Sequence, residues 1–190
     1  KTLLVVRNAL RQRRLEKANR SLLRQLSRDT EILGDSEAAR RVRAAAEAAG
    51  SSDAPVLICG EPGSGRETVA RHVHAASRRA EGALVHVPCG ALDATAGGAI
   101  LFGADGARGR LALADRGSVF LEDVDALPGD LQAAVAAWMP DHPGVRWIAT
   151  AAADPAGLKS PLREHLDVIR ITTAPLRVRR IPSSATDAGG

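Results

Sequence analysis

Residues 56–68 have the sequence VLICGEPGSGRET. The first four residues form a short, continuous apolar run, which predicts a strand buried in a parallel sheet. A glycine-rich loop follows, and a helical pattern then extends from Glu67 to about Arg79. Strand, loop and helix in this order are typical of a phosphate-binding site, because the loop amides and the helix N-terminus can point at one anion.

The residues that we predict to bind phosphate are Gly60, Glu61, Pro62, Gly63, Ser64, Gly65, Arg66, Glu67 and Thr68. The motif has lysine at the position of Arg66, where a compact ammonium interacts with the phosphates. Arg66 keeps the positive charge but carries it on a larger, planar guanidinium. We therefore expect weakened nucleotide binding, with hydrolysis more strongly affected. A glycine turn with a purely structural role is the alternative interpretation.

A second candidate site follows another apolar run. Residues 119–121 predict a buried strand that ends in two adjacent acids, Glu122 and Asp123. Such a pair can hold Mg²⁺ and polarise an attacking water. Taken alone, the two acids could simply end a strand. Their place downstream of the loop, in the same predicted sheet, favours a functional role.

The remaining core alternates strands with helices. Apolar runs predict further strands at 84–87, 118–121 and 146–150, and a helix at 131–138. Ser36 is a plausible N-cap for another helix that extends to Ala49, before a turn-rich break. This alternation predicts an α/β sheet.

The two ends of the chain have a different character from the core. Residues 1–33 form an amphipathic pattern that predicts one long linker helix, which either pairs in a coiled coil or lies on its own domain. Residues 181–190 are rich in Ser, Ala, Pro and Gly and predict a disordered tail. We therefore place the nucleotide-binding domain at 34–180.

Composition limits the classes of function. The 190 residues carry a net charge of +4, and 45% of them are hydrophobic, which suits one main globular domain. The basic N-terminal segment is more typical of a solvated helix face than of a DNA-binding surface. Cys59 and Cys89 lack metal-ligand spacing, so we expect reduced core thiols. No apolar run has the length of a membrane span, so we expect a cytoplasmic protein without membrane contact.

Five segments occur in the order known from one protein family. They are residues 56–71, 87–92, 101–103, 117–124 and 174–177. Together they resemble the sigma-54-interacting AAA+ domain of NtrC-type transcription activators, over about residues 32–179. The N-terminal helix is similar to the linker that joins a receiver domain to this module, as in two-component response regulators.

The resemblance implies a P-loop NTPase (AAA+) fold, with a parallel sheet flanked by helices, and ATP and Mg²⁺ as cofactors. Glu122 matches the acid that holds the metal, and Asp123 matches the acid that reaches the catalytic water. The family has these acids in the order Asp-Glu, so the second acid is one methylene shorter here. Arg163 matches a finger arginine that contacts a neighbour's nucleotide, although an ordinary surface arginine is the alternative. These three residues are our catalytic candidates.

Other positions depart from the family pattern. The GAFTGA loop that contacts sigma-54 is reduced to Gly106-Ala107, and the sensor position, usually Asn, is Ala152. After Arg180 there is no pattern for a helical lid or a helix-turn-helix, so we expect both to be missing. Sigma-54 contact is therefore expected to be weak, and no direct DNA-binding domain is predicted.

Two functions remain open on these residues. The first is an ATP-binding regulatory module that acts through self-association, with impaired hydrolysis. The second is an active ring-forming ATPase that remodels sigma-54 RNA polymerase, which would require the altered residues to work. A decayed fragment without independent activity is a variant of the first.

Overall fold

The computed structural model describes residue 32 and residues 34–173, all within one compact unit that begins at Ile32. The predictions for the N-terminal helix and for the tail at 181–190 lie outside the described residues. Five strands form one parallel sheet in the order β2-β3-β4-β1-β5. The strands are β1 (Val56–Cys59), β2 (Leu84–Pro88), β3 (Ser118–Glu122), β4 (Arg146–Ala151) and β5 (Ile169–Thr172).

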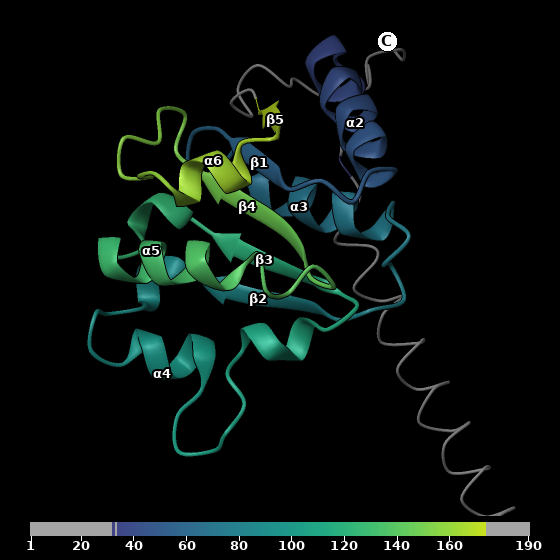
Figure 1. The fold of residues 1–190 in the computed structure, drawn as a ribbon. Helices are drawn as coiled ribbons and strands as arrows, with labels where there is room; N and C mark the ends of the chain where they lie inside the picture. The colour runs from purple at the N-terminus through teal and green to yellow at the C-terminus, as the bar shows by residue number, and fades with distance from the viewer. Residues whose placement is uncertain (1–31, 33, 174–190) are drawn as a thin grey trace, which may run out of the picture. The chain divides into compact units, whose positions relative to one another are not determined.

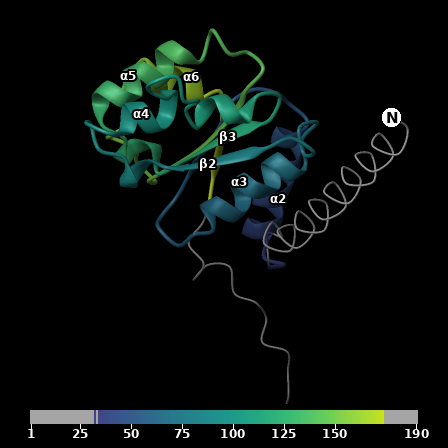
Figure 2. The same ribbon diagram turned by 90° about the horizontal axis from the view of Figure 1, so that it is seen from below.

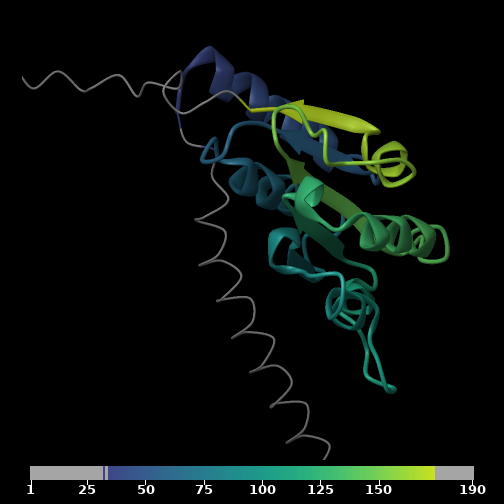
Figure 3. The same cartoon turned by 90° about the vertical axis from the view of Figure 1, so that its left-hand side faces the viewer.

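Helices cover both faces of this sheet (Figure 1). On one face lie α2 (Glu37–Gly50) and α3 (Arg66–Ala75), side by side, as Figure 2 also shows. On the other face lie α4 (Gly97–Phe102), α5 (Gly129–Trp138) and α6 (Leu162–Leu166), with the sheet between the two layers (Figure 3). Three short 3-10 turns complete the unit: η2 (Cys89–Ala91), η3 (Leu111–Ala114) and η4 (Val124–Ala126). The predicted α/β fold is confirmed.

Alternation along the strands divides the core in two. Leu57 and Leu121 face the layer of α4, α5 and α6. Their neighbours Ile58 and Phe120 face α2 and α3. Successive strand side chains point to opposite faces, and here both faces are covered, so these strands need apolar residues at every position. This explains why β1 is a continuous apolar run.

Parallel pairing brings the carboxyl ends of the strands to one edge. Cys59, the last residue of β1, lies opposite Ala151 of β4 and Thr172 of β5. Glu122 of β3 lies opposite Pro88 of β2. The segments that follow these strands therefore meet at one edge, which is where open parallel sheets bind ligands.

The predicted helix boundaries differ from the observed ones in places. Ser36 does cap α2, since its Oγ accepts a hydrogen bond of 3.2 Å from the N–H of Ala39. Helix α3 ends at Ala75, although the sequence pattern suggested about Arg79. Within the part of the chain that the structure describes, no helix combines the length and apolar character needed to cross a membrane.

Candidate functional site

The loop between β1 and α3 is open on its outer side. Gly63 and Gly65 have φ angles of 75° and 81°, a left-handed region that favours glycine. A Cβ on Gly63 would meet no atom within 4 Å. Gly65 caps α3 without any side-chain hydrogen bond, so the first turn of the helix is not closed by the chain's own side chains. This geometry suits an anion.

The base of the loop is anchored to the end of β5. The Oγ atom of Ser64, a residue only 1% exposed, lies 2.6 Å from Oγ1 of Thr173. Thr173 also donates a hydrogen bond of 3.3 Å to the carbonyl of Cys59. A Cβ on Gly60 would lie 2.0 Å from the Thr173 hydroxyl oxygen, so only glycine fits there. Thr173 was not predicted, because its partner Ser64 lies 109 residues away in sequence.

Arg66 meets Asp123, so two predicted site residues are in contact. An Nη atom of Arg66 lies 2.9 Å from an Oδ atom of Asp123, and the two side chains are 11% and 47% exposed. Asp123 has a φ angle of 52°, and its N–H donates a hydrogen bond of 3.0 Å to Oγ1 of Thr150. The loop and the strand end predicted from sequence thus lie in contact.

Glu122 has a different partner. Its Oε2 atom lies 2.8 Å from Nε2 of His86, and the His86 ring stacks on Phe120 with centroids 5.0 Å apart. His86 was missed from sequence, because only the pairing of β2 with β3 brings it to this place. Among the described residues, no group of three or more His, Cys, Asp or Glu side chains could hold a metal ion. Glu122 would therefore bind a metal only together with other ligands.

The segment after β4 completes this edge of the sheet. The N–H of Ala152 donates a hydrogen bond of 3.3 Å to Oδ2 of Asp125, while Oδ1 of Asp125 is buried without a hydrogen-bond partner. Ala152 presents only a methyl group at the predicted sensor position. Arg163 lies half-buried on α6. Its predicted role concerns a neighbouring subunit and stays a prediction.

The two cysteines are buried and unpaired, as predicted. Burial, together with the nearby carboxylates of Asp123 and Glu122, raises the pKa of the Cys89 thiol to about 12. Burial also raises the pKa of Cys59. A thiol must lose its proton to act as a nucleophile or metal ligand, so neither cysteine is suited to such chemistry.

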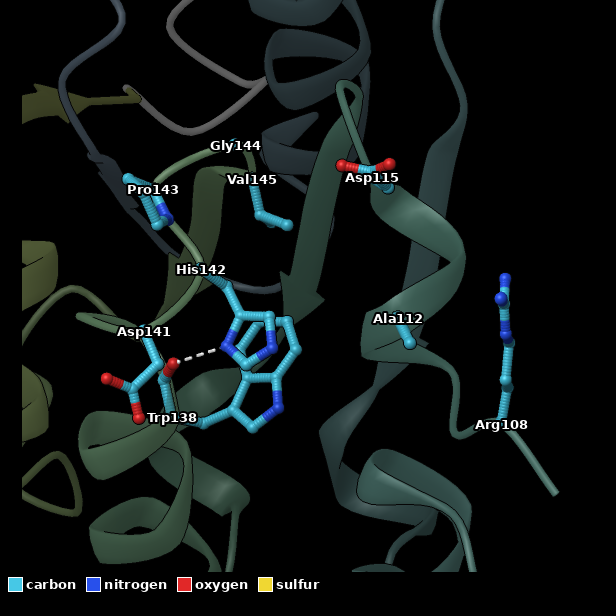
Figure 4. A pocket seen from close by; sticks show the side chains of 9 residues that line it. All are labelled: Arg108, Ala112, Asp115, Trp138, Asp141, His142, Pro143, Gly144 and Val145. Carbon is cyan, nitrogen blue, oxygen red and sulfur yellow. Dashed lines mark hydrogen bonds between the residues drawn. The ribbon is translucent and has the colours of Figure 1, made fainter. Parts of the chain in front are cut away.

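A separate pocket of about 390 Å³ opens near the start of β4 (Figure 4). Its wall includes Trp138 and His142, whose rings stack with centroids 3.4 Å apart. Nδ1 of His142 bonds the carbonyl of Trp138 at 2.9 Å. The other lining residues are Arg108, Ala112, Asp115, Asp141, Pro143, Gly144 and Val145. None of the site residues predicted from sequence lines this pocket.

Comparison with known proteins identifies the family. Residues 32–147, more than half of the chain, match the model of the sigma-54 interaction domain. The nitric oxide reductase transcription regulator NorR2 of Cupriavidus necator is 34% identical over an alignment that is 197 residues long with gaps and covers 91% of this chain and 36% of that protein. The chain thus spans about a third of the length of this relative.

Solved structures agree with this result. NtrX from Brucella abortus, crystallised with ADP, superposes with a TM-score of 0.79 at 26% identity, over 93% of this chain and 45% of that one. The P-loop NTPase domain of a sigma-54 activator from E. coli superposes with a TM-score of 0.57 at 24% identity, over 76% of this chain and 99% of that one, and supports the fold. The chain has a P-loop NTPase (AAA+) fold and belongs to the sigma-54 interaction domain family of transcription activators.

Proposed function

We propose that this chain is the ATP-binding module of a sigma-54-type transcription regulator in a two-component system, with impaired hydrolysis and weakened contact to sigma-54. The observation that carries the proposal is the loop between β1 and α3. Its outer side is open, its helix is uncapped by side chains, and a guanidinium lies at the first helical position. These features suit the phosphates of a nucleotide.

The chain's own residues can be assigned to parts of the nucleotide. The backbone N–H groups of residues 60–68, apart from Pro62, would hold the phosphates, and Arg66 would supply a positive charge to balance theirs. The Glu122 carboxylate would hold Mg²⁺, which neutralises phosphate charge when it is bound. ADP in the NtrX structure supports a nucleotide rather than another anion.

Three features support impaired hydrolysis. Glu122 is paired with His86, so the acid expected to hold the metal already has a protein partner. Asp123 is one methylene shorter than the acid that the family has at its position. Ala152 offers a methyl group where the family has an amide that can orient water or phosphate. Phosphoryl transfer depends on the placement of such groups, and a displacement of about 1 Å can cost about a hundredfold in rate.

The short connection after α4 supports a weak sigma-54 contact. The N–H of Arg110 bonds the carbonyl of Ile100 at 2.9 Å and closes the loop of residues 103–109. This loop stands where family members carry the longer GAFTGA segment. Self-association through the N-terminal segment and a cytoplasmic location complete the proposal.

The second candidate function is a ring ATPase that remodels sigma-54 RNA polymerase. Arg163 on α6 favours it, because this residue is only partly buried and so stays accessible to a neighbouring subunit. In that case Arg163 of one subunit would act on the nucleotide of the next, so activity would depend on assembly.

Calorimetric titration of the chain with ATP and ADP, with and without Mg²⁺, followed by phosphate release, tests both functions. Micromolar binding with little release supports the regulatory module, and Arg66→Ala should then abolish this micromolar binding and leave only weak, millimolar binding. Turnover that rises with protein concentration and is lost in Arg163→Ala supports the ring ATPase. Absence of binding to either nucleotide would overturn both.

A further inference from the structure

The side chain of Arg66 is already occupied by an anion of the chain itself. It extends from the first residue of α3 to the end of β3, where it reaches the Asp123 carboxylate at 2.9 Å. The guanidinium is only 11% exposed, so it has little freedom to leave this position. The other acid of this strand end, Glu122, pairs with His86 instead. Asp123 is therefore the acid that competes for Arg66.

The backbone holds Asp123 in the direction of Arg66. Its φ and ψ angles of 52° and 55° belong to the left-handed region, which Asp and Asn enter more easily than Glu. Its N–H is fixed on the hydroxyl of Thr150, a residue only 1% exposed. The backbone of Asp123 is thus fixed by the ends of β3 and β4, while its side chain, which is 47% exposed, has room to turn away from Arg66.

A carboxylate and a phosphate bind a guanidinium through the same N–H groups. Both accept charge-assisted hydrogen bonds from the planar guanidinium. An ion pair with the carboxylate therefore reduces the binding free energy that the phosphate gains. We propose that Asp123 is an internal competitor of the nucleotide, whose carboxylate holds Arg66 in the free chain and is displaced when a phosphate binds. This inference rests on the proposed nucleotide function.

A group that holds the metal or supports the phosphate strengthens nucleotide binding. As a competitor, Asp123 weakens it. Removing its charge should tighten nucleotide binding. Asp123→Asn is the suitable change, because Asn tolerates the same backbone angles and retains the backbone bond to Thr150. The gain should be about three- to tenfold in affinity, the range expected for a partly exposed ion pair.

The experiment is a calorimetric titration of the chain with ADP in EDTA, so that no metal contributes. Asp123→Asn should bind about three- to tenfold more tightly than the wild type. Asp53→Asn is the matched control, because Asp53 pairs with Arg79 at 3.1 Å with exposures of 55% and 19%, and it lies before β1, away from the loop. It should leave the affinity unchanged. Equal or weaker binding by Asp123→Asn would overturn the inference.

The same substitution in a variant without the Arg66 cation distinguishes competition for Arg66 from simple repulsion between Asp123 and phosphate. In Arg66→Met, which lacks the cation, Asp123→Asn should give no gain. The same gain in both backgrounds would overturn the inference, since the effect would then not pass through Arg66. Wild-type binding without a gain in Asp123→Asn leaves the proposed function intact, whereas absence of ADP binding in every variant overturns both.

Discussion

At the scale of the residue, Gly60 is confined by the Thr173 hydroxyl. A Cβ at position 60 would lie 2.0 Å from Oγ1 of Thr173 and 2.8 Å from Oγ of Ser64. We expect Gly60→Ala to lower the free energy of unfolding by about 1–3 kcal/mol, the usual cost of overpacking a buried site. Urea unfolding followed by circular dichroism measures this change.

Two further variants test the cause of that loss. Gly90→Ala adds the same methyl group where the nearest atom lies 3.9 Å away, so we expect little change. Thr173→Ala removes the colliding hydroxyl, so Gly60→Ala should cost less in that background than in the wild type. A cost independent of residue 173 would show that the collision is not its source.

The residues of the site differ in how visible they are in the sequence. Arg66 and the Glu122–Asp123 pair could be predicted, because each follows a local pattern of strand, loop and helix. The contact between Arg66 and Asp123 could not, since it depends on how β1 and β3 are spaced in the sheet. Thr173 and His86 gave no signal, because a single Thr or His in a strand or directly after one has no distinctive neighbours.

At the scale of the element, a buried cation joins the end of α2 to the start of β4. The guanidinium of Arg146, a residue 1% exposed, donates a hydrogen bond of 2.6 Å to the carbonyl of Ala49 and one of 3.5 Å to that of Gly50. The last carbonyls of a helix lack partners within the helix and carry partial negative charge. Arg146 supplies both the hydrogen bonds and the positive charge.

We expect Arg146→Met to lower the free energy of unfolding by about 1–3 kcal/mol, because the Gly50 carbonyl loses the Arg146 donor and the Ala49 carbonyl keeps only the N–H of Ser52. Hydrogen exchange measured by mass spectrometry should show the largest increase in the amides of α2. Arg41→Met is the control, since Arg41 is on α2 itself but is 78% exposed in its pair with Glu37, so we expect less than about 0.5 kcal/mol. Uniform loss of protection across the sheet would contradict the assignment to α2.

The elements that the sequence predicted are those with long or strong patterns. β1, β3 and β4 are buried on both faces, so their residues form apolar runs that stand out. β5 lies at the sheet edge and alternates Ile169 and Ile171 with exposed Arg170 and Thr172, over only four residues. Helices α4 and α6, of six and five residues, are too short for a helical period. Tertiary packing defines these elements.

At the scale of the whole molecule, stability in acid depends on the groups whose pKa differs between the folded and the unfolded chain. Burial lowers the pKa of His74 from its ordinary value, and the charge of Arg146 lowers it further. The pKa values of Asp53 and Asp167 are also lowered, mainly by hydrogen bonds from Arg79 and Arg170. The aspartates titrate below about pH 4, so their contribution is separate from that of the histidine.

We expect stability to fall as the pH drops below about 6.5, the ordinary pKa of histidine. Below that pH the unfolded chain binds a proton at His74, whereas the folded chain, with its lowered pKa, does not. The unfolded state then holds more protons, so the free energy of unfolding decreases by up to about 1.4 kcal/mol per pH unit until the folded-state pKa is reached.

His74→Gln tests this cause, because Gln cannot be protonated and can still hydrogen-bond Ser118, which His74 contacts at 3.0 Å. Urea unfolding between pH 7 and pH 5 should show a free energy of unfolding that falls with pH in the wild type and falls less steeply in His74→Gln. Below pH 4 both proteins should lose stability through the aspartates. An identical slope in the two proteins between pH 7 and pH 5 would assign the acid sensitivity to groups other than His74.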